Sequence, residues 1–214
     1  MKKKIYNLIL VIIFPAIIFM LILTINGEIY TIEENFDELD LSVWKISDKR
    51  LGNTFLNPDN IDVNNGQLQI KLPANLLEGG EISAIPKTQF GKYEVKMKLP
   101  DAPSSITGFF LYEPPDYYHE IDIEIFNQPD GKYLLTTYAD GNVQNEFSGY
   151  LGFDPTADFH MYGFYFQSDQ LKFYVDKLMA ASFTTGYSNE PMRLMVNAWY
   201  PNWLASSPLA RMLF

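Results

Sequence analysis

Polar and apolar residues alternate along much of the chain after residue 28, and this period of two predicts β-strands. Residues 90–99 place charged side chains on one face and mostly apolar side chains on the other. Residues 67–72 alternate in the same way behind Asn65-Gly66, a dipeptide typical of hairpin turns. Because residues 28–214 contain many such runs and no convincing amphipathic helix pattern, we expect one all-β domain, a sandwich of two stacked antiparallel sheets.

The first 27 residues form a segment of a different kind. Three lysines, Lys2 to Lys4, precede an almost wholly apolar stretch from Ile5 to Ile25, which is about the length that crosses a bilayer as a helix. We predict an N-terminal hydrophobic helix over residues 1–27 that serves as a signal peptide or as a membrane anchor, with a buried core helix as the alternative. The lysines before the stretch direct residues 28–214 outward, so the protein is expected to be secreted or anchored to the outer face of the cytoplasmic membrane.

The charge balance narrows the choice of partner. The chain carries 16 basic and 26 acidic side chains, a net charge of −10, and removing the three leading lysines leaves 13 − 26 = −13. Nucleic-acid binding depends on clustered Lys and Arg, so no nucleic-acid partner is expected. The 3 Trp, 14 Tyr and 16 Phe residues suit surfaces that stack flat, hydroxylated ligands. We expect a monomer that contacts a membrane only through its N-terminal segment.

The cysteine and histidine content excludes several classes of site. With no cysteine, the chain has no disulfide framework, thiolate zinc site or cysteine nucleophile. Its two histidines, His119 and His160, are too few for a three-histidine metal site, and we interpret His160 as structural. The sequence also has no G-x-S-x-G elbow, P-loop or G-x-G-x-x-G run. We therefore predict no cofactor and no metal ligand among the functional residues.

Candidate chemistry is concentrated between His119 and Ile125. In a strand, the alternation of acids and isoleucines puts Glu120, Asp122 and Glu124 on one face and the isoleucines on the other. Three interpretations fit this pattern: an ordinary strand with its acids in solvent, a calcium site, or a carboxyl pair for glycoside cleavage.

The spacing of the two glutamates is compatible with the third interpretation. Their Cα atoms lie roughly 13 Å apart in a strand, and side chains that lean inward could bring the carboxyl groups to about 5 to 6 Å. Two carboxyls about 5 to 5.5 Å apart cleave a glycosidic bond with retention, one as nucleophile and the other as acid and then base. Crowding of like charges raises the pKa of at least one carboxyl, which then keeps the proton that a leaving group needs.

Around this strand the sequence resembles glycoside hydrolase family 16, in particular the bacterial lichenases with their E-I-D-I-E motif. Segments similar to the family's follow in its order along most of residues 33–204: residues 35–44, 90–98, 151–154, 159–162, 173–176 and 197–199. The resemblance implies a jelly-roll, concanavalin A-like sandwich with a concave cleft. It makes residues 28–214 a glycoside hydrolase domain whose partner is a polysaccharide.

The resemblance also implies roles for individual residues. Glu120 matches the nucleophile, Glu124 the general acid/base, and Asp122 the assisting carboxyl that hydrogen-bonds the nucleophile. Six further residues fall on cleft positions of the lichenase pattern: Tyr118, Tyr138, Glu146, Asn197, Trp199 and Glu81. Tyr118 stands where lichenases carry a tryptophan that stacks on sugar. The unbulged spacing of the three acids favours a linear β-glucan, of the β-1,3-1,4 or a related kind.

The sequence departs from the family pattern at several places. His119 replaces an aspartate, and Ser83 stands where an arginine is expected. Family members normally finish with a further strand that contains an aspartate and a tryptophan, whereas residues 205–214 do not alternate like such a strand. We therefore expect the last strand to be missing, and with it the family's calcium-binding aspartate.

Our main hypothesis is a retaining, endo-acting glycoside hydrolase that cleaves a β-glucan through a glycosyl-enzyme intermediate on Glu120. Three alternatives stay open. In the first, the domain is a carbohydrate-binding sandwich without catalysis, since fold alone does not fix function. In the second, it is a truncated, impaired family member. In the third, it is a transglycosylase, in which a sugar reaches the intermediate before water does.

Overall fold

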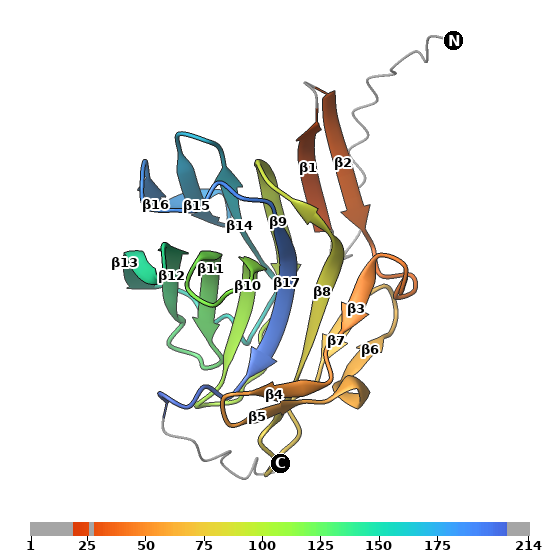
Figure 1. Cartoon of the computed structure of the whole chain (residues 1–214). Coiled ribbons are helices and arrows are strands. Elements are labelled where there is room, and N and C mark those ends of the chain that lie inside the picture. Colours follow the sequence, from red (N-terminus) through yellow and green to blue (C-terminus); the bar gives the residue numbers. More distant parts are fainter. Residues whose placement is uncertain (1–18, 26–27, 205–214) are drawn as a thin grey trace, which may run out of the picture.

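The computed structural model describes residues 19–25 and 28–204 of the 214-residue chain. In these residues two sheets face each other across one apolar core, and the regular structure is otherwise a short hairpin and a single turn of 3-10 helix (Figure 1). The prediction of an all-β sandwich is confirmed. Neighbouring strands pair antiparallel, except that β5 (Thr54–Leu56) runs parallel to β8 (Glu78–Thr88).

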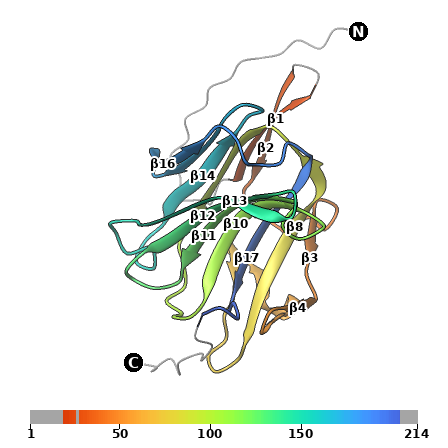
Figure 2. The ribbon, with the colours of Figure 1, turned by 60° about the vertical axis from the view of Figure 1, so that its left-hand side comes forward.

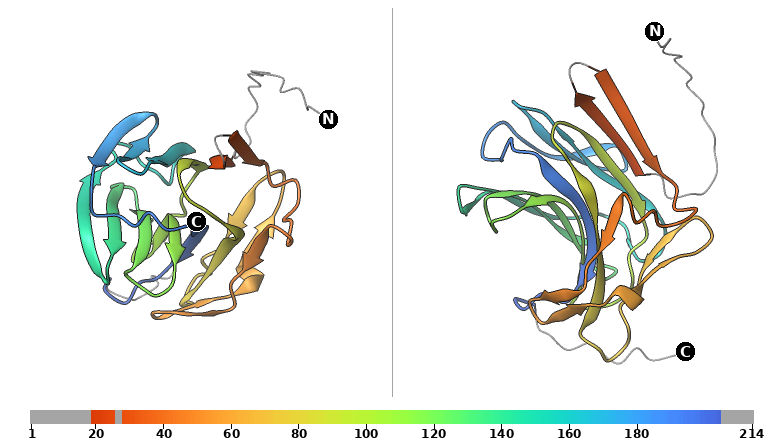
Figure 3. Two further views of the ribbon diagram at one scale, coloured as in Figure 1. Left: turned by 45° about the horizontal axis from the view of Figure 1, so that its top comes forward. Right: turned by 45° about the vertical axis from the view of Figure 1, so that its right-hand side comes forward.

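The nine-stranded sheet has the order β13-β12-β11-β10-β17-β8-β5-β4, with β3 paired to β8. Its remaining strands are β3 (Trp44–Ile46), β4 (Lys49–Leu51), β10 (Ile106–Glu113), β11 (His119–Phe126), β12 (Lys132–Ala139), β13 (Asn142–Tyr150) and β17 (Met192–Trp199). These strands bend along their length, as β17 shows clearly in the right panel of Figure 3.

The six-stranded sheet has the order β16-β15-β14-β9-β1-β2. Its strands are β1 (Phe19–Ile25), β2 (Glu28–Glu34), β9 (Gly91–Met97), β14 (His160–Phe166), β15 (Leu171–Val175) and β16 (Leu178–Phe183). Figure 2 shows β14 and β16 in a layer above β10, β11 and β12. The 3-10 turn Pro58–Asn60 leads into the hairpin of β6 (Ile61–Val63) and β7 (Leu68–Ile70).

The core lies between the two sheets and follows from the alternation that the sequence shows. In β11, Ile121, Ile123 and Ile125 are buried in the core, whereas the acids between them line the opposite face of the sheet. Aromatic rings from the other sheet fill the centre, and Tyr93 stacks on Phe164 with ring centroids 4.9 Å apart. The strand that carries the acids is therefore fixed by apolar packing on its rear face.

The predicted N-terminal hydrophobic helix is wrong in the part that the structure describes. Residues Phe19–Ile25 form strand β1, which pairs with β2 and with the edge of β9 (Figure 1). A short apolar run fits a strand as well as a helix, and the edge of a sheet offers backbone groups that a strand can pair with. Among the described residues, no helix has the length and apolar character needed to cross a bilayer.

Several predictions concern residues outside the described part of the chain. Residues 1–18 and 26–27 belong to the proposed signal peptide or anchor, and residues 205–214 to the place of the expected missing strand. The division into residues 1–27 and 28–214, the loss of the last strand and the loss of the calcium ligand all stay predictions.

Candidate active site

A groove of ≈ 480 Å³ lies on the face of the nine-stranded sheet that is turned away from the core. Glu120, Asp122 and Glu124 all line it, because alternate residues of β11 point to this face. The register gives each acid one neighbour on β12 and one on β10: Tyr138 and Tyr112 for Glu120, Thr136 and Phe110 for Asp122, and Leu134 and Gly108 for Glu124. The acids thus occupy the middle of the groove, between strands that contribute aromatic, hydroxyl and apolar side chains.

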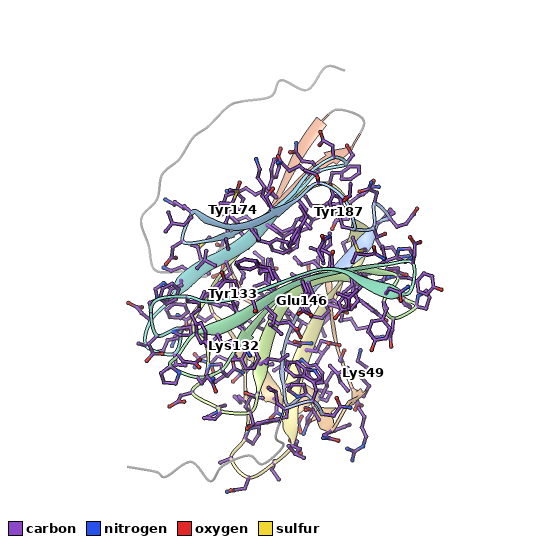
Figure 4. All side chains as sticks on the ribbon, turned by 90° about the vertical axis from the view of Figure 1, so that its left-hand side faces the viewer. Lys49, Lys132, Tyr133, Glu146, Tyr174 and Tyr187 are labelled. Atoms are coloured by element: carbon purple, nitrogen blue, oxygen red, sulfur yellow. The ribbon has the colours of Figure 1, made fainter. Side chains whose placement is uncertain are left out.

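The structure brings eight of the nine predicted site residues to this groove: Glu81, Glu120, Asp122, Glu124, Tyr138, Glu146, Asn197 and Trp199. They come from β8, β11, β12, β13 and β17. Figure 4 labels Glu146, which is on the edge strand β13, and Lys49, which is on the opposite edge strand β4. The groove therefore crosses most of the width of the sheet.

Tyr118 is the predicted site residue that does not line the groove. Its ring packs against the turn between β12 and β13, where a Cβ added to Gly141 would lie 3.2 Å from the Tyr118 ring. The preceding residue, Tyr117, lines the groove instead, and its ring centroid lies 5.4 Å from that of Tyr138. Of these two tyrosines, Tyr117 is therefore the one that lines the groove, and the sugar-stacking role that the resemblance implies for Tyr118 stays a prediction.

Burial and like charge govern the protonation of the three acids. Burial, together with the charges of Glu124 and Asp116, raises the pKa of Glu120 to about 8, while a hydrogen bond with Asp122 lowers it. Burial raises the pKa of Glu124 to about 7. Burial and the charges of Glu120 and Glu124 raise the pKa of Asp122, and so does its hydrogen bond to Glu120. Asp122 is therefore the donor in that hydrogen bond, and it favours the ionised form of Glu120.

A buried carboxylate on β8 organises one side of the groove. Glu81 is 1% exposed. The Ser47 hydroxyl donates to its Oε1 at 2.6 Å, Asn197 Nδ2 donates to its Oε2 at 3.1 Å, and Lys49 Nζ lies 3.0 Å from Oε1. Because an ionised carboxylate only accepts hydrogen bonds, the Asn197 amide must turn its NH₂ group toward Glu81. Its Oδ1 then faces Gly108, where an added Cβ would lie only 2.7 Å away.

We expect Glu81→Gln to destabilise the fold by about 1 to 3 kcal/mol. The NH₂ group of the glutamine is a donor and would face a buried donor, at a place where the carboxylate of Glu81 accepts a hydrogen bond. Lys49→Met is the matched control. It removes a partner whose side chain is 51% exposed, and its cost should stay below about 1 kcal/mol. Urea denaturation of both variants measures the two free energies of unfolding. Equal losses of unfolding free energy in the two variants would contradict this prediction, because the buried carboxylate would then contribute no more to stability than its exposed partner.

Two buried oxygen atoms of the groove have no hydrogen-bond partner among the described residues. They are Thr136 Oγ1 and Asn197 Oδ1. Buried polar atoms are nearly always paired in folded proteins, so unpaired ones in a groove call for a ligand or water that supplies the partner. Hydroxyl groups of a bound carbohydrate are suitable donors for both atoms.

Sequence reasoning missed several residues that line the groove: Lys49, Leu51, Gly108, Phe110, Tyr112, Asp116, Tyr117, Leu134, Thr136, Met195 and Trp203. Some of these had a usable signal. In residues 106–113, every second position shares a face with the acids once β10 is paired with β11, and a glycine inside a strand indicates a close approach. Lys49 and Trp203 had no such signal, because their positions depend on contacts between segments that are distant in the sequence.

The predictions about metals and cofactors are not tested by this structure. Among residues 19–25 and 28–204, no group of three or more histidine or acidic side chains is arranged to hold a metal ion. The calcium ligand that the resemblance implies would belong to residues 205–214, outside the described part of the chain.

Comparison with known proteins identifies the family. The model of glycosyl hydrolases family 16 matches residues 50–208, which is well over half of the chain. The chain belongs to this family. The E-x-D-x-E strand of this family 16 chain lies within the matched range, as do the groove residues of β8, β10, β12, β13 and β17.

Curated relatives of this family 16 chain include bacterial β-glucanases. The β-glucanase of Acetivibrio thermocellus is 30% identical over 175 residues, which cover 77% of this chain and 52% of the relative. The β-glucanase of Paenibacillus polymyxa is 33% identical over 153 residues, which cover 67% of this chain and 64% of the relative. The chain thus spans only about half to two thirds of the length of these relatives.

Solved structures give the same picture for the fold. The Bacillus licheniformis β-glucanase superposes with a TM-score of 0.74 at 26% sequence identity, covering 85% of this chain and 90% of that chain. A β-1,3-1,4-glucanase (lichenase) from a mouse hindgut metagenome superposes with a TM-score of 0.70 at 27% identity, covering 78% and 84% of the two chains. The family 16 sandwich is therefore present over most of the described residues.

Proposed function

We propose that this family 16 member is an endo-acting glycoside hydrolase that cleaves a β-glucan, of the β-1,3-1,4 or a related kind. The observation that carries the proposal is the row of Glu120, Asp122 and Glu124 along the floor of one groove, with raised pKa values for all three. A row of acids exposed on a flat surface would serve solubility. A row that lines a groove, with Asp122 buried and the two glutamates half-buried, is the arrangement that acid/base chemistry needs. The similarity to bacterial β-glucanases supports the choice of polymer.

The proposed reaction is a double displacement. In the first step, Glu124 gives its proton to the glycosidic oxygen while the ionised carboxylate of Glu120 attacks the anomeric carbon, so the leaving chain departs as an alcohol. In the second step, Glu124 takes a proton from a water molecule, the water oxygen attacks the same carbon, and Glu120 is released as a carboxylate. Asp122 donates a hydrogen bond to Glu120 that favours the ionised form, which the first step needs, against the burial and neighbouring charges that raise the pKa of Glu120.

Binding groups on both sides of the acids favour cleavage inside a chain. Glu81 and Asn197 lie on the β8 and β17 side, whereas Tyr138 and Glu146 lie on the β12 and β13 side. Adjacent strands are about 4.8 Å apart, so these groups can hold sugar units on each side of the scissile bond. A polymer bound on both sides is cut internally, which is the endo mode.

The direct test measures release of reducing ends from lichenan, laminarin, xyloglucan and carrageenan by wild type and by Glu120→Gln. We expect wild type to act on lichenan and the variant to be slower by about 10³-fold or more, because glutamine cannot form the glycosyl ester. Circular dichroism and thermal unfolding verify that both proteins are folded. Equal activity of the two proteins would remove Glu120 from the mechanism.

The products of the same assay separate the other candidate functions. Retention predicts that the first-formed reducing end has the β configuration, which NMR detects before mutarotation. Products longer than the substrate would indicate transglycosylation. Oligosaccharide binding by a folded wild-type protein without turnover would favour the carbohydrate-binding sandwich or an impaired family member.

A further inference from the structure

The connection between β16 and β17 carries the chain from the six-stranded sheet to the nine-stranded sheet (Figure 1). We call residues 184–190 of this connection the crossover segment. Its Tyr187 packs against the core between the two layers, with the ring edge-on to that of Phe166 and the centroids 6.0 Å apart (Figure 4). Asn189 Nδ2 donates a hydrogen bond to the Ser168 carbonyl at 3.4 Å. These contacts fix the crossover segment to the side of the sandwich that contains β14.

Ser188 joins the crossover segment to the start of β11. Its hydroxyl oxygen lies 2.7 Å from His119 Nδ1 and accepts a hydrogen bond from Glu190 N at 3.2 Å. Ser188 is only 8% exposed, so this hydrogen bond is largely shielded from competing water. His119 is on the same face of β11 as the core residue Ile121, and it directly precedes Glu120 in the chain. The hydrogen bond therefore holds β11 from behind, next to the proposed nucleophile.

The crossover segment is also attached to β12 and β13. Thr137 Oγ1 donates a hydrogen bond to the Gly186 carbonyl at 2.6 Å. Asn145 Nδ2 lies 2.9 Å from Thr137 Oγ1 and 2.9 Å from each of the carbonyl oxygens of Thr185 and Gly186. Gly186 has a φ of 79°, and an added Cβ would lie only 2.7 Å from Asn145 Nδ2. Glycine is therefore required where the crossover segment approaches these two strands.

The three attachment points have the same relation to the groove on each strand. His119 precedes Glu120 on β11, Thr137 precedes Tyr138 on β12, and Asn145 precedes Glu146 on β13. Neighbouring residues of a strand point to opposite faces, so each attachment fixes the backbone from which the next side chain enters the groove. The β12–β13 ladder is interrupted by a register shift between Thr137 and Tyr138, where its own hydrogen bonds hold the strands less firmly. The crossover segment thus links three groove strands from behind.

We propose that the crossover segment positions the acid row, with His119 and Thr137 as positioning residues for Glu120 and Tyr138. This inference rests on the proposed function and extends it to residues behind the groove. None of residues 184–190 lines the groove, so their effect on the reaction passes through the backbones of β11 and β12. A displacement of about 1 Å at a reacting group can cost about 10²-fold in rate, which makes such support important for catalysis.

The experiment removes one attachment at a time with little change of shape. His119→Phe keeps a ring but loses the hydrogen bond to Ser188, whereas His119→Asn keeps a polar atom near the position of Nδ1. Thr137→Val removes only the hydroxyl group. Thr88→Val is the matched control, because Thr88 is also a buried threonine, accepts a hydrogen bond from the Tyr93 hydroxyl at 2.9 Å and does not line the groove.

Activity on lichenan is the first measurement, with kcat expressed per folded molecule from urea denaturation of each protein. We expect His119→Phe and Thr137→Val to lower kcat about tenfold while KM stays within about threefold, because the reacting groups lose their alignment and most binding groups do not. His119→Asn should keep kcat within about threefold of wild type, and Thr88→Val within about twofold. Thr88→Val should nevertheless lose stability to a degree comparable with Thr137→Val, since both delete one buried hydroxyl group.

Titration of the Glu120 carboxyl group separates positioning from stability without any turnover. NMR of protein with ¹³C-labelled glutamate follows the midpoint of this titration, and burial with the charges of Glu124 and Asp116 raises the pKa to about 8 in the wild type. A loosened β11 or β12 admits water to the carboxyl group, so the midpoint should fall by about one pH unit in His119→Phe and in Thr137→Val. It should stay at the wild-type value in Thr88→Val. An unchanged midpoint in His119→Phe and Thr137→Val would overturn the inference, and so would an equal fall of kcat in Thr88→Val.

Failure of this inference is distinguishable from failure of the proposed function. If wild type hydrolyses lichenan and both His119→Phe and Thr137→Val keep its kcat, the positioning role is wrong and the enzyme assignment stands. If wild type cleaves none of the polysaccharides but the Glu120 midpoint still falls in both variants, the positioning role stands and the enzyme assignment is wrong.

Discussion

Replacing Glu124 with glutamine is expected to lower kcat/KM on lichenan by about 10² to 10⁴-fold, the usual contribution of a general acid. The glycosidic oxygen of a polysaccharide is a poor leaving group until it is protonated. Glu124 is the group placed for that proton transfer, four residues from Glu120 on the same face of β11. Glutamine keeps the size of the side chain but has no acidic proton, so the first step of the reaction should be slowed most.

A change of leaving group provides the control. In an aryl β-glucoside oligomer the leaving group is an acidic phenol, which departs without protonation. Glu124→Gln should therefore lose much less activity on this substrate than on lichenan. A structural defect would reduce both substrates alike, and that result would contradict the assignment of Glu124 as the acid.

The pH profile gives a second check on the same residue. Burial raises the pKa of Glu124 to about 7, and burial with the charges of Glu124 and Asp116 raises that of Glu120 to about 8. The reaction needs one proton on this pair, on Glu124 with Glu120 ionised, so activity of the wild-type protein on lichenan should pass through a maximum between about pH 7 and pH 8 and decline on the alkaline side. The alkaline decline should be absent from the profile of Glu124→Gln.

Much of this site was predictable from the sequence because its central feature is local. Alternation within seven residues fixes which side chains of β11 face the core and which face the groove, and the structure agrees with that prediction. The isoleucines determine the orientation of β11 as much as the acids do. Shifting the register by one residue would expose all three isoleucines, so apolar burial selects the orientation that presents the acids together.

What failed in the prediction depends on turns and on distant contacts. Tyr118 and Tyr117 precede the strand, where a turn with a left-handed residue replaces the period of two, so alternation could not tell which ring enters the groove. The contact between Lys49 and Glu81 joins residues that are far apart in sequence, and only the pairing of strands brings them together. The apolar run that includes Phe19–Ile25 has no periodicity that separates a helix from a strand.

The raised pKa values also imply that the acid row lowers the stability of the fold at alkaline pH. The pKa of Glu120 rises from 4.5 to about 8, first because of burial and then because of the charges of Glu124 and Asp116. The native protein therefore binds this proton more tightly than the unfolded chain does. Below pH 4.5 both states are protonated and the contribution to stability is fully present. Between pH 4.5 and about 8 the unfolded chain loses the proton first, so the free energy of unfolding falls as the pH rises.

Glu120→Gln should remove this dependence because its amide stays neutral at every pH. We expect the variant and the wild type to have similar free energies of unfolding near pH 4.5, and the variant to be more stable by about 2 to 4 kcal/mol at pH 8.5. Urea denaturation at a series of pH values measures the difference. Glu146→Gln changes an exposed carboxyl group at the edge of the same groove and should shift the curve by less than about 0.5 kcal/mol. A wild-type curve that does not fall over this range would mean that the native state holds the Glu120 proton no more tightly than the unfolded chain. That result would contradict the assignment of Glu120, Asp122 and Glu124 as a row of acids that share protons.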